Sequence, residues 1–428
     1  MKILAVTKYP PIQGGVSASA YWLCNTLVQL GHQVSVVTNA DEIEGNFRLN
    51  INIHDVERLK IDGVHVFNTR TIQQDSYIPW ANPYMSKLLG QCLELINVDR
   101  PDIIYGSYFE PYGLVAAIAG KINNIPVFIR HAGSDLGRLS YHPQLRESYR
   151  WMLKNTILVS PFTTEFAGAF GDISLNRVYM PRSRLPAIFN ADAVILDFQK
   201  EMETADKWYR SALDDPQLNS WANEHRFREI DDNVVKIGVY GKVADAKGSF
   251  DLLHACQQLA EEGVNFNLFC MVSGSRLKLE QFYQFVRSSP FLSQRTWLLP
   301  PIAPWRVPNF LASCDIIAFL ERGFSVSFHT PMIPREVLAV GPCLICSGEI
   351  ARKRDYERSW VHRENIFVVD DPRDARYLVG ALREVIANPD LRDRIAAQGR
   401  YLSKFWERSL PSYRESAEKL ISEIETMF

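Results

Sequence analysis

The segment Val234–Gly248 reads VVKIGVYGKVADAKG, an apolar strand followed by a turn that contains two glycines and two lysines. A helix is expected to open directly afterwards, near Ser249. Where a parallel strand meets a helix N-terminus, backbone N–H groups and the helix dipole favour an anion. Lys242 and Lys247, five residues apart, could hold a diphosphate from either side. A surface turn with solvated lysines is the alternative for this stretch taken alone.

The same succession of strand and helix runs along both halves of the chain. The strands lack polar alternation, which is typical of parallel strands covered on both faces. Because βαβ crossovers build doubly wound sheets and 428 residues are many for one core, we expect an α/β fold of two Rossmann-like domains with a cleft between them. The expected strands are Ile3–Thr7, Val34–Thr38, Val64–Phe67, Ile103–Gly106, Val127–Arg130, Ile157–Ser160, Val235–Tyr240, Leu268–Val272, Thr296–Leu299, Ile316–Leu320, Leu344–Cys346 and Ile366–Val369.

The domain boundaries follow from changes in composition. Residues 1–197 form the expected N-terminal Rossmann-like domain, and residues 233–404 form the second one. Residues 198–232 are rich in Glu, Asp, Trp and Asn and poor in strand signals, which indicates a helical insertion and linker. Residues 405–428 have helical periodicity and are expected to pack back on the N-terminal domain.

Composition excludes several classes of protein. The net charge of −2 gives no basic surface for nucleic acid. Seven scattered cysteines, of which only Cys343 and Cys346 are close and lie in an apolar, strand-like run, favour a reducing, cytoplasmic location. No apolar run reaches the length of about 18 residues that a membrane helix needs, although peripheral membrane contact stays open. Neither HExxH nor GxSxG occurs, so we expect no metal site and no α/β-hydrolase nucleophile.

Polar and glycine residues follow the expected strands of the first half. Gly14 and Gly15 stand before the first helix, where a backbone without Cβ can approach a ligand closely. His131 follows the strand Val127–Arg130 and can donate to a hydroxyl or phosphate. Ligands bind at such strand ends, although a plain turn explains the glycines equally well. Sugar-binding groups of the acceptor are expected at three further positions: Tyr108, Glu110 and Asp135, the last of which could instead cap a short helix.

In the second half a long loop, Phe319–Pro331, precedes a helix that Pro334 is suited to begin. Glu336 would lie in the first turn of that helix and could accept two ribose hydroxyls. A simple partnership with the helix dipole is the alternative.

Taken in order, these segments resemble the retaining glycosyltransferases of family four, which have the GT-B fold. The resemblance begins with Gly14-Gly15-Val16 and the stretch Leu30–Thr38, and it covers nearly the whole chain. It continues through four further stretches: His131–Asp135, Ala187–Phe198, Gly241–Gly248 with lysine in place of an arginine, and Glu336–Cys343.

The resemblance implies transfer of a sugar from a nucleotide diphosphate sugar to an acceptor, without a metal or other cofactor. The N-terminal domain would hold the acceptor, and the C-terminal domain would hold the donor. Lys242 and Lys247 would neutralise the diphosphate leaving group, and Glu336 would bind the ribose. His131 would touch the transferred sugar, and Gly15 would offer a backbone N–H to the phosphate. The acceptor stays open among glycans, lipid-linked sugars and small molecules.

One position departs from the family pattern. The family has two glutamates eight positions apart, but the residue eight before Glu336 is Phe328. Glu321 is seven residues earlier still, too far to replace the missing carboxylate without a rearranged loop. The transferred sugar would then be held by the segment around His329, Thr330 and Met332. A catalytically degenerate GT-B protein that binds a nucleotide or sugar as a regulator or partner is the alternative function, and a phosphorylase or a nucleotide-sugar epimerase is another.

Overall fold

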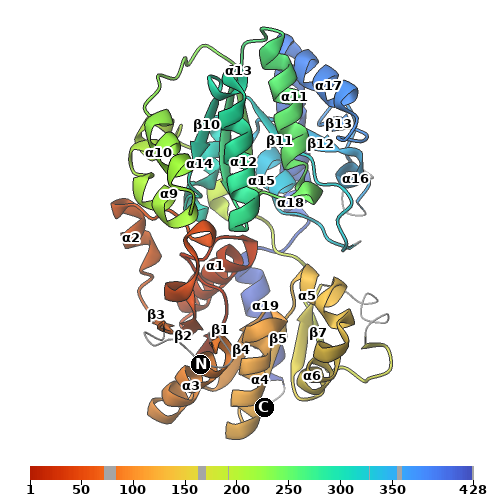
Figure 1. Ribbon diagram of the computed structural model, residues 1–428. Coiled ribbons are helices and arrows are strands. Elements are labelled where there is room, and N and C mark those ends of the chain that lie inside the picture. Colours follow the sequence, from red (N-terminus) through yellow and green to blue (C-terminus); the bar gives the residue numbers. More distant parts are fainter. Residues whose placement is uncertain (72–82, 162–169, 191, 327, 354–358, 427–428) are drawn as a thin grey trace.

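The computed structural model describes residues 1–71, 83–161, 170–190, 192–326, 328–353 and 359–426 (Figure 1). Its strands form two parallel sheets, so the predicted α/β architecture with two doubly wound sheets is confirmed. The first sheet has the order β3-β2-β1-β4-β5-β6-β7, and its strands are β1 (Lys2–Val6), β2 (Gln33–Thr38), β3 (Val64–Asn68), β4 (Ile103–Ser107), β5 (Val127–Arg130), β6 (Ile157–Ser160) and β7 (Arg177–Tyr179).

The second sheet repeats this design with six strands in the order β10-β9-β8-β11-β12-β13. They are β8 (Lys236–Lys242), β9 (Asn267–Ser273), β10 (Thr296–Leu299), β11 (Ile316–Phe319), β12 (Cys343–Ser347) and β13 (Phe367–Val369). Every residue of β9, β10, β11 and β12 is buried, because helices cover both faces of the sheet. All seven cysteines are buried and free.

Helices connect the strands and cover the sheets. Those of the lower half of Figure 1 are α1 (Gly15–Gln29), α2 (Ile53–Leu59), α3 (Tyr84–Val98), α4 (Leu114–Asn123), α5 (Gly133–Gly137) and α6 (Pro143–Lys154). Those of the upper half are α8 (Phe198–Glu203), α9 (Asp206–Ala212), α10 (Pro216–His225), α11 (Ser249–Glu261), α12 (Arg276–Ser288), α13 (Pro290–Ser293), α14 (Val307–Ala312), α15 (Ile333–Val340), α16 (Gly348–Ala351), α17 (Ala375–Ala387) and α18 (Pro389–Arg408).

Two segments at the domain boundaries pack in different halves. The helices α8, α9 and α10 join the upper half, where Trp208 and Tyr209 are buried in the same apolar cluster as the residues of β8 and β9. The last helix, α19 (Tyr413–Glu425), returns to the lower half beside α1 (Figure 1), and it buries Leu420 and Ile424 in the cluster formed by β1 and β2. The chain therefore crosses between the two halves more than once.

Most expected elements are found within two residues of their predicted ends, and the largest omission is β7. This strand has three residues, of which only Val178 is buried, so it lacks the apolar run by which the other strands are recognised. The first helix already includes Gly15, which was expected to stand before it, because Gly14 with φ 119° serves as the N-cap. Among the described helices, none combines the length and the apolar character needed to cross a membrane.

Contacts between the two halves hold the carboxyl ends of their sheets opposite each other. Asn46 is fully buried and donates from Nδ2 to the carbonyl oxygen of Gly274, at 2.7 Å. Gln13, in the loop after β1, accepts a hydrogen bond from the hydroxyl of Ser273 at the end of β9. The loops that follow the strands of both sheets therefore meet at one interdomain junction.

Candidate functional site

The junction lies at the point where strand order reverses in each sheet. In the first sheet the chain runs outward from β1 and then returns to its other side as β4, and β8 and β11 have the same relation in the second sheet. In open α/β sheets, ligands bind outside the carboxyl ends of the strands at such switch points. The loops after these strands supply most of the residues predicted for the site.

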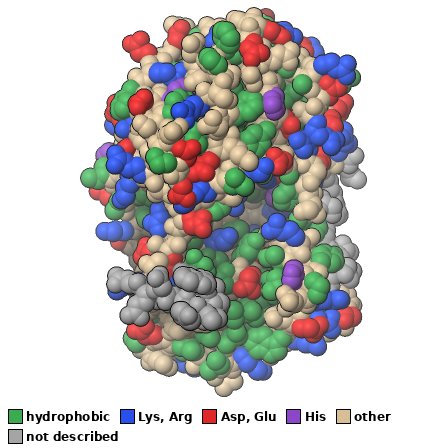
Figure 2. Space-filling model, viewed as in Figure 1, with side chains coloured by type: hydrophobic (Ala, Val, Ile, Leu, Met, Phe, Trp, Pro, Cys, Tyr) green, Lys and Arg blue, Asp and Glu red, His purple; other side chains and the backbone are tan. Residues whose placement is uncertain are grey.

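Figure 2 shows a recess where the two halves of the molecule meet, with Lys and Arg side chains along it. Lys242 is the last residue of β8, and its ammonium group lies 5.4 Å from the centre of the Phe47 ring across the junction. The pKa of Lys242 is lowered to about 8, first because the surrounding protein displaces water, and then by three neighbouring cations, Lys8, Lys247 and Arg138. The electrostatic field at this strand end therefore favours an anion.

The turn after β8 is fixed by a close backbone approach. Gly248 has φ 68° and caps the N-terminus of α11, and a Cβ at this position would lie 2.5 Å from the carbonyl oxygen of Leu320. Only glycine combines this left-handed conformation with this lack of space. The turn η6 (Asp245–Lys247) is thereby held against the loop that follows β11, and it presents Lys247 toward that loop.

Lys247 forms an ion pair with Glu321, whose carboxylate is completely buried. The ammonium group also lies 4.7 Å from the centre of the Phe324 ring. Burial raises the pKa of Glu321, while Lys247 opposes this shift. From the sequence, Glu321 is expected to replace the missing carboxylate only if the loop is rearranged. In the structure the loop after β11 returns to Glu321 through His329.

His329 completes this cluster. Its Nε2 lies 3.7 Å from Oε1 of Glu321, and neither atom has a hydrogen-bond partner within the described part of the chain. Burial, together with the charges of Lys247, Lys353 and Arg182, lowers the pKa of His329 to about 3, so the imidazole is neutral at pH 7. A neutral imidazole and a carboxylate at this spacing can accept and donate hydrogen bonds to one ligand hydroxyl.

The loop after β11 also reaches the N-terminal domain. Phe328 packs against the apolar cluster of that domain, and a Cβ on Gly133 would lie 3.6 Å from Nδ1 of His329. Phe328, the residue at the family's glutamate position, is thus an interdomain packing residue. The two other predicted residues of this segment are less informative: Thr330 is half-buried, and Met332 accepts a hydrogen bond at Sδ from Arg335, at 3.4 Å.

Glu336 lies in the first turn of α15 and accepts a hydrogen bond from the hydroxyl of Tyr240. Tyr240 and Lys242 are two residues apart in β8, so their side chains project from the same face of the strand. Burial raises the pKa of Glu336, and the hydrogen bond from Tyr240 opposes this shift. The structure therefore brings this carboxylate to the same strand end as the lysines.

The N-terminal glycines leave room for a ligand. Gly14 has φ 119°, and a Cβ on Gly14 or on Gly15 would meet no atom within 4 Å. Gly15 is the first residue of α1, both glycines are exposed, and no side chain caps the N–H groups of this helix end. His131 is 8% exposed, and its Nε2 lies 2.9 Å from the hydroxyl of Ser160.

The three predicted acceptor residues surround one loop after β4. Tyr108 has the unusual φ of 79°, and its hydroxyl lies 2.8 Å from that of Ser134. Burial raises the pKa of Glu110. Asp135 is completely buried and accepts at Oδ2 from the backbone N–H groups of Phe109 and Ala132, so it caps the start of α5. Burial raises the pKa of Asp135 to about 7, against the effect of these two hydrogen bonds.

Two cations of the N-terminal domain were not predicted. Lys8 follows β1, with its ammonium group 4.5 Å from the centre of the Tyr108 ring, and Arg138 follows α5. Neither lies in a sequence motif, and a single cation in a loop is usually solvated, so the sequence carried no signal for them.

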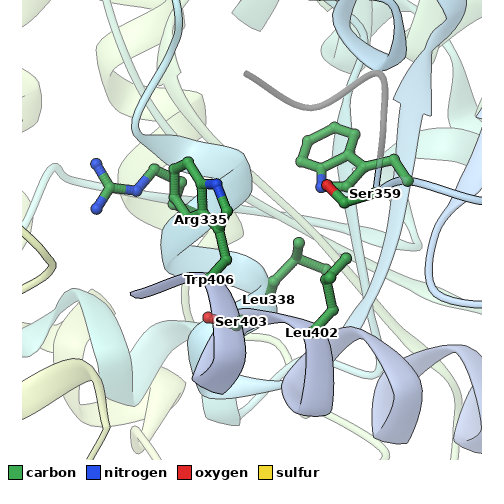
Figure 3. A pocket seen from close by; sticks show the side chains of 7 residues that line it. Arg335, Leu338, Ser359, Leu402, Ser403 and Trp406 are labelled. Carbon is green, nitrogen blue, oxygen red and sulfur yellow. The ribbon is translucent and has the colours of Figure 1, made fainter. Parts of the chain in front are cut away.

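A second hollow lies away from the junction, between α15 and α18. Figure 3 shows its lining, which includes Leu338, Leu402 and Trp406. The cavity volume is about 10 Å³, room for about one water molecule, which excludes a sugar or nucleotide. The Arg335 side chain forms a buried ion pair with Glu407 at 2.8 Å, which fastens α15 to α18. In the described ranges, no group of three or more His, Cys, Asp and Glu side chains could hold a metal ion.

Comparison with known proteins shows which family the N-terminal part of the chain resembles. Residues 13–171 match the model of Glycosyltransferase Family 4. An uncharacterized glycosyltransferase of Methanocaldococcus jannaschii is 32% identical over 107 residues, and this match spans 24% of each chain. The chain thus matches about a quarter of the length of this curated relative.

Solved structures resemble the whole chain. HepE of Anabaena, solved with UDP and glucose, has a TM-score of 0.64 at 14% identity, with both chains covered completely. Sucrose-phosphate synthase of Thermosynechococcus elongatus has a TM-score of 0.61 at 13% identity and covers 100% of this chain and 98% of its own. The resemblance predicted from the sequence is confirmed: residues 13–171 are similar to glycosyltransferase family 4, and the chain as a whole has the GT-B fold.

Proposed function

We propose that the protein is a retaining, metal-independent glycosyltransferase that moves a sugar from a nucleotide diphosphate sugar to an acceptor hydroxyl. The observation that carries this proposal is the position of Lys242 and Lys247 at the switch point of the second sheet, opposite the open N-terminus of α1. The family match of the N-terminal domain supports the same reaction class. UDP is the proposed nucleotide, because HepE, a protein of the same fold, is solved with UDP and glucose.

The lysines supply the electrostatic part of the proposed mechanism. As the bond between the sugar and the diphosphate breaks, negative charge grows on the leaving phosphate oxygens. Lys242 and the N–H groups at the start of α1 are fixed positive groups at that place, so they stabilise the transition state more than the ground state. Because these groups neutralise the leaving group directly, the proposed reaction needs no divalent cation.

Three side chains would hold the rest of the donor. Oε1 of Glu336 would accept hydrogen bonds from ribose hydroxyls, while Oε2 accepts the hydrogen bond from Tyr240. Glu321 and His329 offer their unpaired atoms to a hydroxyl of the transferred sugar. The acceptor hydroxyl would attack from the face that the diphosphate leaves, near His131, so that the product keeps the anomeric configuration of the donor.

Calorimetry with UDP, GDP, ADP and TDP tests the donor site. We expect one nucleotide to bind, and Lys242→Gln to weaken its affinity by at least tenfold without lowering the melting temperature. The matched control is Lys278→Gln, which also removes one lysine. Lys278 lies in α12 and forms an ion pair with Asp245 of the turn η6. Equal nucleotide affinity in the Lys242 variant and the wild type would contradict the proposed phosphate site.

Two measurements on the reaction test its finer properties. With an α-linked donor, NMR of the product should show an α linkage, and a β linkage would contradict retention. Activity should persist in excess EDTA. A loss that Mg²⁺ or Mn²⁺ restores would contradict metal independence.

A second candidate is a binding protein that no longer transfers sugar. Two observations favour it: Phe328 stands at the family's glutamate position and is used for packing, and Lys247 is already paired with Glu321. Slow hydrolysis of UDP-glucose in the absence of an acceptor distinguishes the two candidates, since only a functional site releases UDP. Release of UDP at the uncatalysed rate, despite tight UDP binding, would favour the second candidate.

A further inference from the structure

The N-terminal side of the junction carries two cations, Lys8 and Arg138, that are not among the donor contacts proposed above. Lys8 follows β1, and the loop after β4 brings Tyr108 to it, so the two lie on either side of the switch point of the first sheet. Arg138 follows the short helix α5, which starts after β5. Within the described residues, neither Lys8 nor Arg138 forms an ion pair, in contrast to Lys247 of the other domain.

Two hydroxyl groups stand between these cations. The Tyr108 hydroxyl lies 2.8 Å from Oγ of Ser134, and the ammonium group of Lys8 lies 4.5 Å from the ring of the same tyrosine. Tyr108 is held in this place by a backbone with φ 79°, a conformation that is unfavourable for a tyrosine. Strain of this kind persists where the surroundings fix the residue, and it is common at ligand sites.

The carboxylate of Asp135 does not neutralise the positive charge of Lys8 and Arg138. Asp135 is completely buried, and one of its oxygens is occupied by two backbone N–H groups. Burial raises the pKa of Asp135 to about 7, so near neutral pH it carries only part of a charge. Loss of surrounding water lowers the pKa of Lys8, and the charge of Asp135 opposes this shift. The backbone N–H of Arg138 donates to the carbonyl oxygen of Ser134, at 3.1 Å, which holds Arg138 one helical turn from the Ser134 hydroxyl.

We propose that Lys8, Arg138 and the hydroxyls of Tyr108 and Ser134 form an anion site for a phosphoryl group of the acceptor, separate from the diphosphate site of the donor. A phosphate monoester fits this set better than a carboxylate, because its three terminal oxygens can accept from two cations and two hydroxyls together. The inference rests on the proposed function, in which the N-terminal domain receives the acceptor.

Calorimetry on the full chain tests this site in the presence of saturating UDP, so that the donor phosphate positions are filled. The probes are inorganic phosphate, glucose 6-phosphate and glucose. We expect phosphate and glucose 6-phosphate to bind and glucose to bind at least tenfold more weakly. Lys8→Gln and Arg138→Gln should each weaken phosphate binding by at least fivefold, and each should weaken phosphate binding clearly more than UDP binding.

The control variant is Lys154→Gln. Lys154 is an exposed lysine of the same domain at the end of α6, which leads into β6, so it lies at the amino ends of the strands. The melting temperature of each variant is measured in parallel, and the comparison uses variants that melt within a few degrees of the wild type.

Three outcomes would overturn the inference. If UDP binds but phosphate does not, the anion site is absent and the proposed function still stands. If Lys8→Gln or Arg138→Gln weakens UDP as much as phosphate, these cations belong to the donor site. If neither UDP nor phosphate binds, the proposed function fails and the acceptor site fails with it.

Discussion

At the scale of single residues, the ion pair of Lys247 and Glu321 gives a prediction for both stability and turnover. The carboxylate is completely buried, and a quarter of the lysine side chain is exposed. We expect Lys247→Ala to cost about 2 kcal/mol in the free energy of unfolding, less than a fully buried pair, because an uncompensated carboxylate remains inside. Turnover should fall on the order of a hundredfold, since a cation at the leaving diphosphate is lost.

The double variant Lys247→Ala with Glu321→Gln separates the two roles. Removing the buried charge should restore most of the stability in urea unfolding, but not the turnover. If stability is not recovered, the ion pair does not explain the loss. If turnover returns with stability, Lys247 acts only through the fold.

Lys242 predicts how nucleotide binding depends on pH. Its pKa is about 8 in the free protein, so the ammonium form is complete well below pH 8 and is lost as the pH rises through this value. Because a neutral amine attracts a diphosphate less, the affinity for UDP should fall by roughly tenfold between pH 7.5 and 9.5. In Lys242→Gln the curve should be much flatter, whereas Lys278→Gln should keep the wild-type slope. A wild-type affinity that is constant across this range would contradict the assignment.

At the scale of elements, the parts that could be predicted from the sequence are those with a periodic or local signal. The apolar runs of β8 and β9 locate the second sheet, and the glycines and lysines at the end of β8 and in the following turn locate its proposed anion site. Glu321 could not be assigned, because its role depends on the path of the loop after β11, which has no period. Lys8 and Arg138 were missed for a related reason: Lys8 follows β1 and Arg138 follows the helix after β5, and only the order of the strands brings these two segments to the same edge of the sheet.

The turn between β8 and α11 gives a prediction with a matched control. Gly248 and Gly263 both have positive φ, but only at Gly248 would a Cβ collide, at 2.5 Å from the backbone of Leu320. Gly263→Ala should cost about 1 kcal/mol in unfolding free energy, the strain of the conformation alone. Gly248→Ala should cost at least about 3 kcal/mol, since the turn must move away from the loop after β11.

Nucleotide binding gives the second readout for these glycines. Displacement of the turn moves Lys247, so Gly248→Ala should also weaken UDP binding, and Gly263→Ala should leave it unchanged. Equal stability losses in the two variants would mean that the contact with Leu320 is not decisive.

At the scale of the whole molecule, a buried charge network joins the domains. Arg306, before α14, donates to Asp55 of α2 at 2.8 Å and also pairs with Glu201 of α8. The indole of Trp305 donates to the other oxygen of Asp55, at 2.7 Å. The N-terminal domain is therefore fastened to the C-terminal one by groups that are almost completely removed from water.

Arg306→Gln should weaken this connection more than any exposed pair would. It leaves the carboxylates of Asp55 and Glu201 buried without their cation, which should cost about 3–5 kcal/mol. Because this loss of stability falls at the junction between the domains, calorimetric melting should separate into two transitions, one for each domain. UDP should raise the midpoint of the transition of the C-terminal domain, which contains β8, and should leave the other unchanged. The control is Arg276→Gln, which removes an exposed pair with Asp214 inside one domain and should change stability by about 0.5 kcal/mol or less. One unchanged cooperative transition in Arg306→Gln would show that the domains are held together by their apolar contacts, and that the network only fixes their relative orientation.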